Sequence, residues 1–183
     1  MEIKGPAGAV DERAVRRKYE ALTRSLIEKG RTITAMESCT AGLLASLITD
    51  TEGSSAVFKG SFVTYSNASK IRMGVSDSII EHCGVYSAAC AAAMAEAART
   101  AFGADLAVGV TCTFGNADPN NAGSSPGEVF FAITDAGGTQ CCHCAVPEQP
   151  SRFAYKLYMA DVIADCLLDT IMAEKDNTFF GQK

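Results

Sequence analysis

Apolar residues recur at helical spacing in three long stretches of the chain. Between Asp11 and Lys29 they fall on one face of a helix, and Gly30 stands at the usual position of a helix C-cap. The alanine-rich stretch 88–102 predicts a second long helix, and a third is expected to open at Pro150 and Ser151. Shorter helices are predicted in three places: after Ser38 up to about Thr49, after Asn67 up to Met73, and after Ser76 up to Cys83.

Other apolar runs have the character of strands. The continuous run 106–110 predicts a strand that is buried on both faces, and a short strand from Thr32 leads into an abrupt turn at 37–40. Further strands are predicted at 56–65, 128–134 and 140–146, the last two joined by a hairpin turn. Because helices surround the strands, we expect an α/β fold, a three-layer α/β/α sandwich with a mixed β-sheet.

The 183 residues fit one domain with a sizeable core, which we place at 11–174 between a flexible lead (1–10) and a flexible tail (175–183). Apolar residues make up 48% and charged residues 20%, which excludes a disordered chain. No apolar run is long enough to span a bilayer, and 1–10 has no signal-peptide core. A net charge of -5 argues against nucleic acid as a partner.

Eight cysteines without an export signal predict reduced thiols in a cytoplasmic protein rather than a disulfide framework. The cluster 141–144 (Cys-Cys-His-Cys) contains a Cys-x-x-Cys spacing and is the one candidate metal site. It lies in a predicted strand, where successive side chains point to opposite faces, and no second pair of ligands stands at zinc spacing. We therefore expect no metal.

The turn at 37–40 has two interpretations. Ser38 and Thr40 are good helix-capping residues, so Ser38 can serve only to cap the helix that follows. Alternatively, Ser38 is a reactive group beside a helix N-terminus, whose amide N–H groups attract anions. The local pattern by itself favours the cap.

Polar, reactive residues stand at the predicted ends of several elements. Ser38 follows the first strand, Tyr65 ends the next one, and Lys70 lies five residues later on a short helix, where it can fold back toward Tyr65. Because sites in open α/β sheets gather beyond the carboxyl ends of strands, Ser38, Tyr65 and Thr111 are expected to lie together. Arg152, at the start of the last helix, suits a phosphate.

These residues could hydrolyse an amide, which needs a nucleophile, a base and a donor for the developing oxyanion. Neither histidine looks available as the base, but a lysine whose pKa is lowered by burial or by a nearby cation could activate Ser38. A tyrosine could relay the proton. The plainer alternatives are a half-buried packing role for Tyr65 and solvated surface positions for Lys70 and Arg152.

Three ordered motifs carry a resemblance to a known family: 37–42 (Glu-Ser-Cys-Thr-Ala-Gly), 49–58 (Thr-Asp-Thr-Glu-Gly-Ser-Ser-Ala-Val-Phe) and 60–70 (Gly-Ser-Phe-Val-Thr-Tyr-Ser-Asn-Ala-Ser-Lys). With them the chain resembles the CinA C-terminal domain family, the competence/damage-inducible CinA-like proteins that include PncC-type nicotinamide-nucleotide amidohydrolases. The likeness continues through 84–87, 103–105, 110–111 and 126–129, which is nearly the whole chain beyond the first helix. It implies the stand-alone form, without the larger N-terminal domain of many members.

The resemblance implies a site and an activity. Ser38, Tyr65 and Lys70 match the family's catalytic serine, tyrosine and lysine, with Ser38 as nucleophile or water-orienting group and Lys70 as base. The expected substrate-binding residues are Thr40, Ala41, Gly42, Thr111 and Arg152. The implied reaction converts nicotinamide mononucleotide to nicotinic acid mononucleotide and ammonia, within pyridine-nucleotide recycling. No cofactor is needed, and a homodimer is implied.

The sequence departs from the family pattern near the proposed site. Ala41 and Cys112 stand where the family commonly has glycine, Asn116 replaces a proline, and 149–151 (Gln-Pro-Ser) replaces the usual Gly-Asp before the arginine. Cys112 adds volume beside the expected pocket. A second hypothesis is therefore a nucleotide-binding protein with weak or no catalysis, and a third is a partner role related to competence or DNA damage.

Overall fold

The computed structural model describes residues 1–119, 121 and 124–173, so the predicted tail 175–183 lies outside the described residues. The described helices are α1 (Glu12–Lys29), α2 (Leu43–Thr49), α3 (Asn67–Arg72), α4 (Asp77–Cys83), α5 (Ala88–Phe102) and α6 (Arg152–Ala173), with a short 3₁₀ turn, η1 (Ser54–Ala56). The described strands are β1 (Ile33–Glu37), β2 (Phe58–Val63), β3 (Leu106–Cys112), β4 (Glu128–Asp135) and β5 (Gly138–Ala145).

The five strands form one mixed sheet in the order β2-β1-β3-β4-β5. The first three run parallel, so Glu37 at the end of β1 lies opposite Val63 on β2 and Val110 on β3. The last two run antiparallel and meet in the predicted hairpin, where the Asp135 carboxylate accepts hydrogen bonds from the amides of Gly137 and Gly138. The carboxyl ends of the three parallel strands therefore share one edge.

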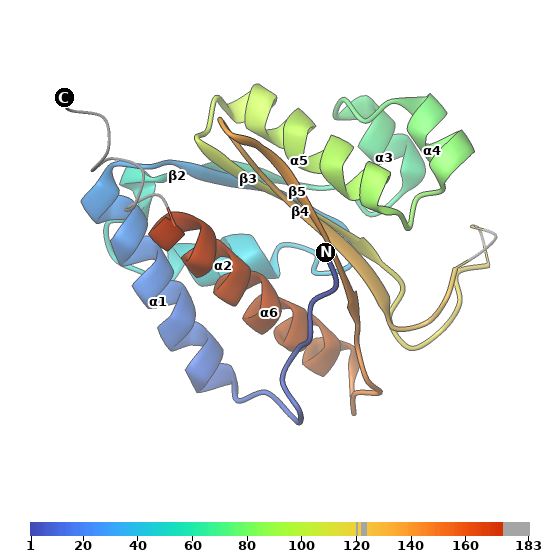
Figure 1. Cartoon of the computed structure of the whole chain (residues 1–183), viewed down its shortest axis with the longest axis horizontal. Coiled ribbons are helices and arrows are strands. Elements are labelled where there is room, and N and C mark those ends of the chain that lie inside the picture. The colour runs from blue at the N-terminus through green and yellow to red at the C-terminus, as the bar shows by residue number, and fades with distance from the viewer. Residues whose placement is uncertain (120, 122–123, 174–183) are drawn as a thin grey trace.

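Helices cover both faces of the sheet, which confirms the predicted three-layer sandwich (Figure 1). On one side α1, α2 and α6 pack against each other and against the sheet, and α3, α4 and α5 lie on the other. The larger core cluster belongs to the α1–α2–α6 side, because apolar side chains of these helices meet the inner face of the sheet. No helix of the described residues is both long enough and apolar enough to cross a bilayer.

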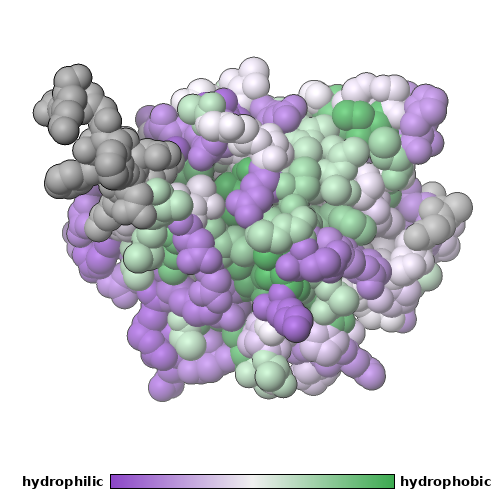
Figure 2. All heavy atoms as spheres, in the orientation of Figure 1, coloured by the Kyte–Doolittle hydropathy of each residue, from purple (hydrophilic) through white to green (hydrophobic). Residues whose placement is uncertain are grey.

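The alanine-rich helix α5 lies unusually close to β3. A Cβ atom on Gly109 would stand 2.1 Å from the Ala91 carbonyl oxygen and 2.6 Å from the Ala95 amide nitrogen. Glycine on the strand and alanine on the helix thus let the two backbones touch. Outer alanines of α5 stay partly exposed, and the upper part of Figure 2 is accordingly more apolar than the hydrophilic region over α1 at the left.

The structure differs from the predicted elements mainly at their ends. The strand predicted at 56–65 is β2 at Phe58–Val63, because η1 occupies the residues before it, and β3 extends two residues beyond the predicted end, to Cys112. The predicted lead pairs with β5: the Ile3 amide donates to the His143 carbonyl at 2.8 Å, and the His143 amide donates to that of Met1 at 2.9 Å. This lead therefore has a defined place, and its flexibility stays a prediction.

The cluster 141–144 alternates between faces as a strand requires. Cys142 and Cys144 are buried in the core, whereas His143 lies on the other face between the carboxylates of Glu2 and Glu128. Burial lowers the pKa of His143, but the hydrogen bonds to the two carboxylates outweigh burial and leave the pKa raised. Among the described residues no group of three or more potential ligands could hold a metal ion.

Candidate functional site

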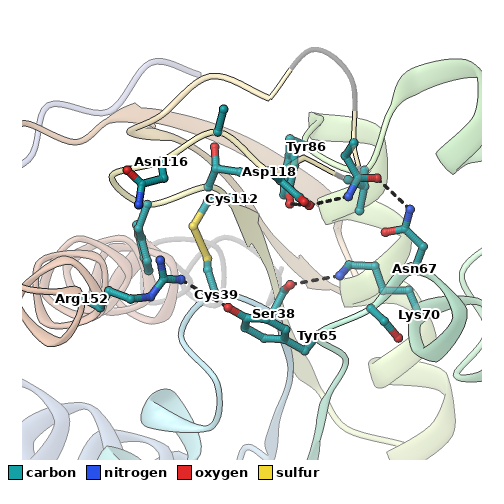
Figure 3. A pocket seen from close by; sticks show the side chains of 16 residues that line it. Ser38, Cys39, Tyr65, Asn67, Lys70, Tyr86, Cys112, Asn116, Asp118 and Arg152 are labelled. Carbon is teal, nitrogen blue, oxygen red and sulfur yellow. Dashed lines mark hydrogen bonds between the residues drawn. A yellow bond between two sulfur atoms is a disulfide. The ribbon is translucent and has the colours of Figure 1, made fainter.

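A cavity of about 500 Å³ lies beyond the carboxyl ends of the parallel strands (Figure 3). Its walls are formed by the turn after β1, the segment from Tyr65 to Lys70, the residue pair 85–86, the segment 112–118 with Asn121, and the start of α6. Four residues of chemical interest that were expected from the sequence line this cavity: Ser38, Tyr65, Lys70 and Arg152. The sheet topology thus gathers residues that lie up to 114 positions apart, and for Ser38 and Tyr65 this agrees with the rule that sites gather beyond the carboxyl ends of parallel strands.

Ser38 and Lys70 form the inner part of the site. The Lys70 ammonium donates to Ser38 Oγ at 3.0 Å and to the Thr64 carbonyl at 2.8 Å. Both side chains are buried, with Lys70 1% and Ser38 6% exposed. Lys70 extends from α3, whose N-terminus is fixed by a capping box between Ser66 and Ser69. The predicted serine–lysine pair is therefore brought within hydrogen-bond distance.

The environment of Lys70 makes its proton easier to remove than that of an exposed lysine. Burial lowers the pKa of Lys70 below the usual lysine value, and this effect outweighs the opposing electrostatic effects of Cys90 and Asp118. The lysine makes no ion pair within the described part of the chain. A lysine with a lowered pKa is a better candidate than an ordinary lysine for accepting the proton of an adjacent hydroxyl, which is what a serine nucleophile requires.

The prediction that Ser38 or Thr40 caps α2 is wrong. Helix α2 begins after Gly42, whose φ is 91°, and no side chain caps it from that position. Instead the fully buried Glu37 carboxylate reaches forward and accepts hydrogen bonds from three amides at the helix start: Gly42 at 3.0 Å, Leu44 at 3.1 Å and Ala45 at 3.0 Å. The anion that the helix N-terminus attracts is therefore part of the protein itself.

Thr40, Ala41 and Gly42, which were expected to bind substrate next to Ser38, lie outside the lining of the cavity. The side chain of Thr40 is fully buried, and its hydroxyl has no hydrogen-bond partner among the described residues. Ala41 is exposed and adopts a φ of 52°, the left-handed conformation that glycine would favour. The Gly42 amide is engaged by Glu37. None of Thr40, Ala41 and Gly42 lines the cavity.

Tyr65 and Arg152 form the outer wall of the cavity. The Arg152 guanidinium donates to the Tyr65 hydroxyl at 3.3 Å, and Tyr65 is 65% exposed. The sequence predicts that Lys70 folds back toward Tyr65. Among the described residues the Tyr65 hydroxyl has no hydrogen bond to Ser38 or Lys70, and Lys70 contacts Ser38 instead. Figure 3 shows this pair on the side of Ser38 opposite Lys70. The Arg152 guanidinium thus lies at the opening of the cavity, separate from the buried Ser38–Lys70 pair.

Thr111 does not face the cavity. Its side chain is fully buried, and its hydroxyl donates to the Val85 carbonyl at 2.9 Å. Val85 itself lines the cavity, so Thr111 supports the wall from behind. This placement corrects the expectation that Thr111 touches the substrate.

Sequence reasoning missed a polar cluster opposite Arg152. The Asp118 carboxylate accepts hydrogen bonds from the Tyr86 hydroxyl at 2.6 Å and from Asn121 Nδ2 at 2.5 Å, and Asn67 Nδ2 donates to Asn121 Oδ1 at 2.8 Å. Two of these residues belong to the long Asn- and Gly-rich loop between β3 and β4. The length of that loop was the available signal, because loops of this kind are usually functional.

A disulfide in the cavity wall was also missed. Cys39, directly after Ser38, is bonded to Cys112 at the end of β3, and their Cα atoms lie 5.9 Å apart. The expectation of eight reduced thiols is therefore wrong for this pair, while the other six cysteines are free. The signal was present in principle, because both residues follow neighbouring parallel strands at the same edge, where two cysteines can reach each other.

Comparison with known proteins decides the family. The family model described as the CinA C-terminal domain matches residues 16–163. The chain belongs to the CinA C-terminal domain family. A CinA-like protein from Geobacter sulfurreducens is 43% identical over 121 residues, which is 64% of this chain and 29% of the relative. A putative competence-damage inducible protein from Streptococcus gordonii is 44% identical over 134 residues, which is 72% of this chain and 31% of the relative. The chain thus spans under a third of the length of these CinA relatives.

Solved structures of CinA superfamily proteins have the same fold. A CinA superfamily protein from Klebsiella pneumoniae superposes with a TM-score of 0.80 at 22% identity, covering 87% of this chain and 98% of the other. The competence/damage inducible protein CihA from Agrobacterium tumefaciens gives a TM-score of 0.77 at 24% identity, covering 89% and 98%. At this identity the likeness shows the CinA fold alone.

Proposed function

We propose that the protein is an amidohydrolase that releases ammonia from the carboxamide of nicotinamide mononucleotide. The observation that carries the proposal is the hydrogen bond between buried Lys70 and Ser38 in a cavity with Arg152 at its mouth. Membership of the CinA C-terminal domain family, which includes amidohydrolases of this kind, supports it.

In the proposed reaction, neutral Lys70 takes the proton of Ser38 as Oγ attacks the carboxamide carbon. The proton then passes to the leaving nitrogen, ammonia departs, and water hydrolyses the ester formed on Ser38. The developing oxyanion needs an N–H donor, and the amide of Cys39 has no acceptor among the described residues. Glu37 takes the amides of the α2 start, so that helix is not the donor.

The phosphate of the substrate would bind at Arg152. The guanidinium fork matches phosphate geometry, and the Tyr65 hydroxyl next to it can donate to a phosphate oxygen. The polar cluster of Asp118, Tyr86, Asn67 and Asn121 bounds the other side of the cavity, where carboxylate and amide oxygens can accept hydrogen bonds from sugar hydroxyls.

The test is ammonia release from nicotinamide mononucleotide by the purified protein, beside Ser38→Ala and Lys70→Ala. We expect turnover in the parent protein and its loss in both variants, with melting temperatures close to that of the parent. Absence of ammonia release from nicotinamide mononucleotide and from every other pyridine nucleotide tried would rule the proposal out.

A second candidate is a nucleotide-binding protein without catalysis. The observation that favours it is Cys112, whose disulfide with Cys39 adds two sulfur atoms to the wall beside Ser38. This candidate predicts that nicotinamide mononucleotide raises the melting temperature while no ammonia is released. The Ser38–Lys70 hydrogen bond, which a purely binding protein does not need, makes the amidohydrolase the better proposal.

A further inference from the structure

The disulfide between Cys39 and Cys112 lies at the border of the core and the cavity, because both cysteines belong to the buried core cluster and both line the cavity. Both cysteines line the cavity together with Ser38 and Lys70, and they are 4% and 5% exposed. Figure 3 shows the two sulfurs between Ser38 and the 112–118 segment. The bond therefore borders the cavity, and a reagent that reaches it must be small enough to enter there.

The other cysteines differ in this respect. None of the six free cysteines lines the cavity. Cys90, which lies near Lys70, is fully buried, and burial raises its pKa to about 11, so it stays a thiol. Cys83 is exposed on α4, away from the site, and serves as an internal reference for thiol reagents.

The disulfide also holds the reacting turn. The Ser38 amide donates to the Val110 carbonyl at 3.2 Å, and one residue later Cys39 is covalently joined to the end of the same strand. Breaking the bond removes the covalent link between the turn that carries Ser38 and the end of β3, so the turn is then held by hydrogen bonds and packing alone.

We propose that the Cys39–Cys112 pair is a redox-modification site within the cavity, at which a small dithiol opens a disulfide that keeps Ser38 in its reactive position. The effect on turnover rests on the proposed amidohydrolase function, whereas the modification itself does not. Nicotinamide mononucleotide, when bound, covers the sulfurs and protects them.

The dithiol supplies all the electrons and protons that the reduction of the disulfide needs. A thiolate of the dithiol attacks one of the two sulfurs, the Cys39–Cys112 bond breaks, and a mixed disulfide forms while the other cysteine leaves as a thiolate that takes up a proton. The second thiol of the reductant then attacks the mixed disulfide and closes an intramolecular disulfide. The protein gains two electrons and two protons, and the dithiol loses them.

The first experiment maps the thiols in the full chain, purified without reductant. Alkylation with iodoacetamide after denaturation should modify six cysteines and leave one peptide pair linked, Cys39 to Cys112, whereas prior treatment with dithiothreitol should give eight modified cysteines. Alkylation of Cys39 and Cys112 in the untreated protein, persisting after incubation with oxidised dithiothreitol, would overturn the proposal.

The second experiment follows protection and turnover. Saturating nicotinamide mononucleotide should slow the reduction of the pair by dithiothreitol at least tenfold, without changing the alkylation rate of Cys83. Reduction should lower kcat about tenfold or more with KM changed less than twofold, and oxidised dithiothreitol should restore it. Cys112→Ala should show the lowered kcat in both conditions, whereas Cys83→Ser should respond like the parent protein.

The outcomes separate the two proposals. An unchanged or higher kcat after reduction overturns the positioning role of the disulfide. If neither redox state releases ammonia, the proposed function fails. The thiol mapping needs no substrate, so the presence or absence of the linked Cys39–Cys112 peptide still decides whether the modification site exists.

Discussion

Ser38 Oγ and Lys70 Nζ lie 3.0 Å apart although 32 residues separate them in the chain. The contact exists because Ser38 follows β1 while Lys70 lies on α3, which follows the neighbouring parallel strand β2. Lys70 reaches back over the Thr64 carbonyl, to which it also donates. The serine and the lysine are thus held by segments that follow two neighbouring strands of the sheet rather than by one flexible loop.

Lys70→Met should abolish the amidohydrolase reaction while keeping the fold. Methionine fills similar space without an amine, so kcat should fall about a hundredfold to ten-thousandfold, the usual contribution of a general base. Lys59→Met, an exposed lysine on β2, is the matched control and should leave kcat unchanged. Comparable turnover in the two variants would show that Lys70 is not the base.

The pH dependence of the parent protein follows from the lowered pKa of Lys70. Because the proposed mechanism needs the neutral amine, kcat/KM should increase with pH and level off above an apparent pKa that lies below 10.5, the usual lysine value. The measurement is a pH–rate profile at low substrate concentration. A profile that is flat, or that declines with increasing pH through this region, contradicts the role of a neutral Lys70.

Arg152→Ala should weaken binding of the phosphate group. Charged hydrogen bonds contribute about 1.5–3 kcal/mol, so KM for nicotinamide mononucleotide should increase about tenfold to a hundredfold with kcat little changed. Nicotinamide riboside lacks the phosphate and provides the control, because its kcat/KM should be the same in the variant and the parent. Equal losses for both substrates would place the phosphate elsewhere.

Glu37→Gln should destabilise the protein although it changes only one atom of the carboxylate. The two carboxylate oxygens accept from Gly42, Leu44 and Ala45, and a glutamine presents an NH₂ group to at least one of these donors. An unsatisfied buried donor costs about 1–3 kcal/mol of the free energy of unfolding. Urea denaturation measures this loss, and the exposed Glu52→Gln should cause no measurable change.

Gly109→Ala should disrupt the contact between α5 and the sheet. The added methyl group would meet backbone atoms of α5 rather than a movable side chain, so the helix must shift. We expect a loss of about 3 kcal/mol in the free energy of unfolding. Gly8→Ala, where a Cβ meets no atom within 4 Å, is the control. A stable Gly109→Ala protein would show that α5 packs less closely than described.

The sequence predicts the sandwich and the meeting of Ser38 and Tyr65 because both depend on periodicity and on the rule that parallel strands end at one edge. The same rule predicts Thr111 at the cavity, whereas the structure buries its side chain behind the wall. It does not predict how the turn after β1 distributes its hydrogen bonds. Serine is a common helix-capping residue, but here the Glu37 carboxylate caps α2, because its longer side chain reaches the amides at the helix start. The Cys39–Cys112 bond depends on pairing across strands, which composition cannot reveal.

Residues 1–3 cover part of the outer edge of β5, the last strand of the sheet. By pairing with His143, Met1 and Ile3 occupy backbone donors and acceptors on β5 that would otherwise face a neighbouring molecule. Uncovered edges of this kind are templates on which other chains add strands and aggregate. A truncation that begins after residue 4 should therefore leave the cavity around Ser38 and Lys70 intact and yet favour self-association through the uncovered edge of β5.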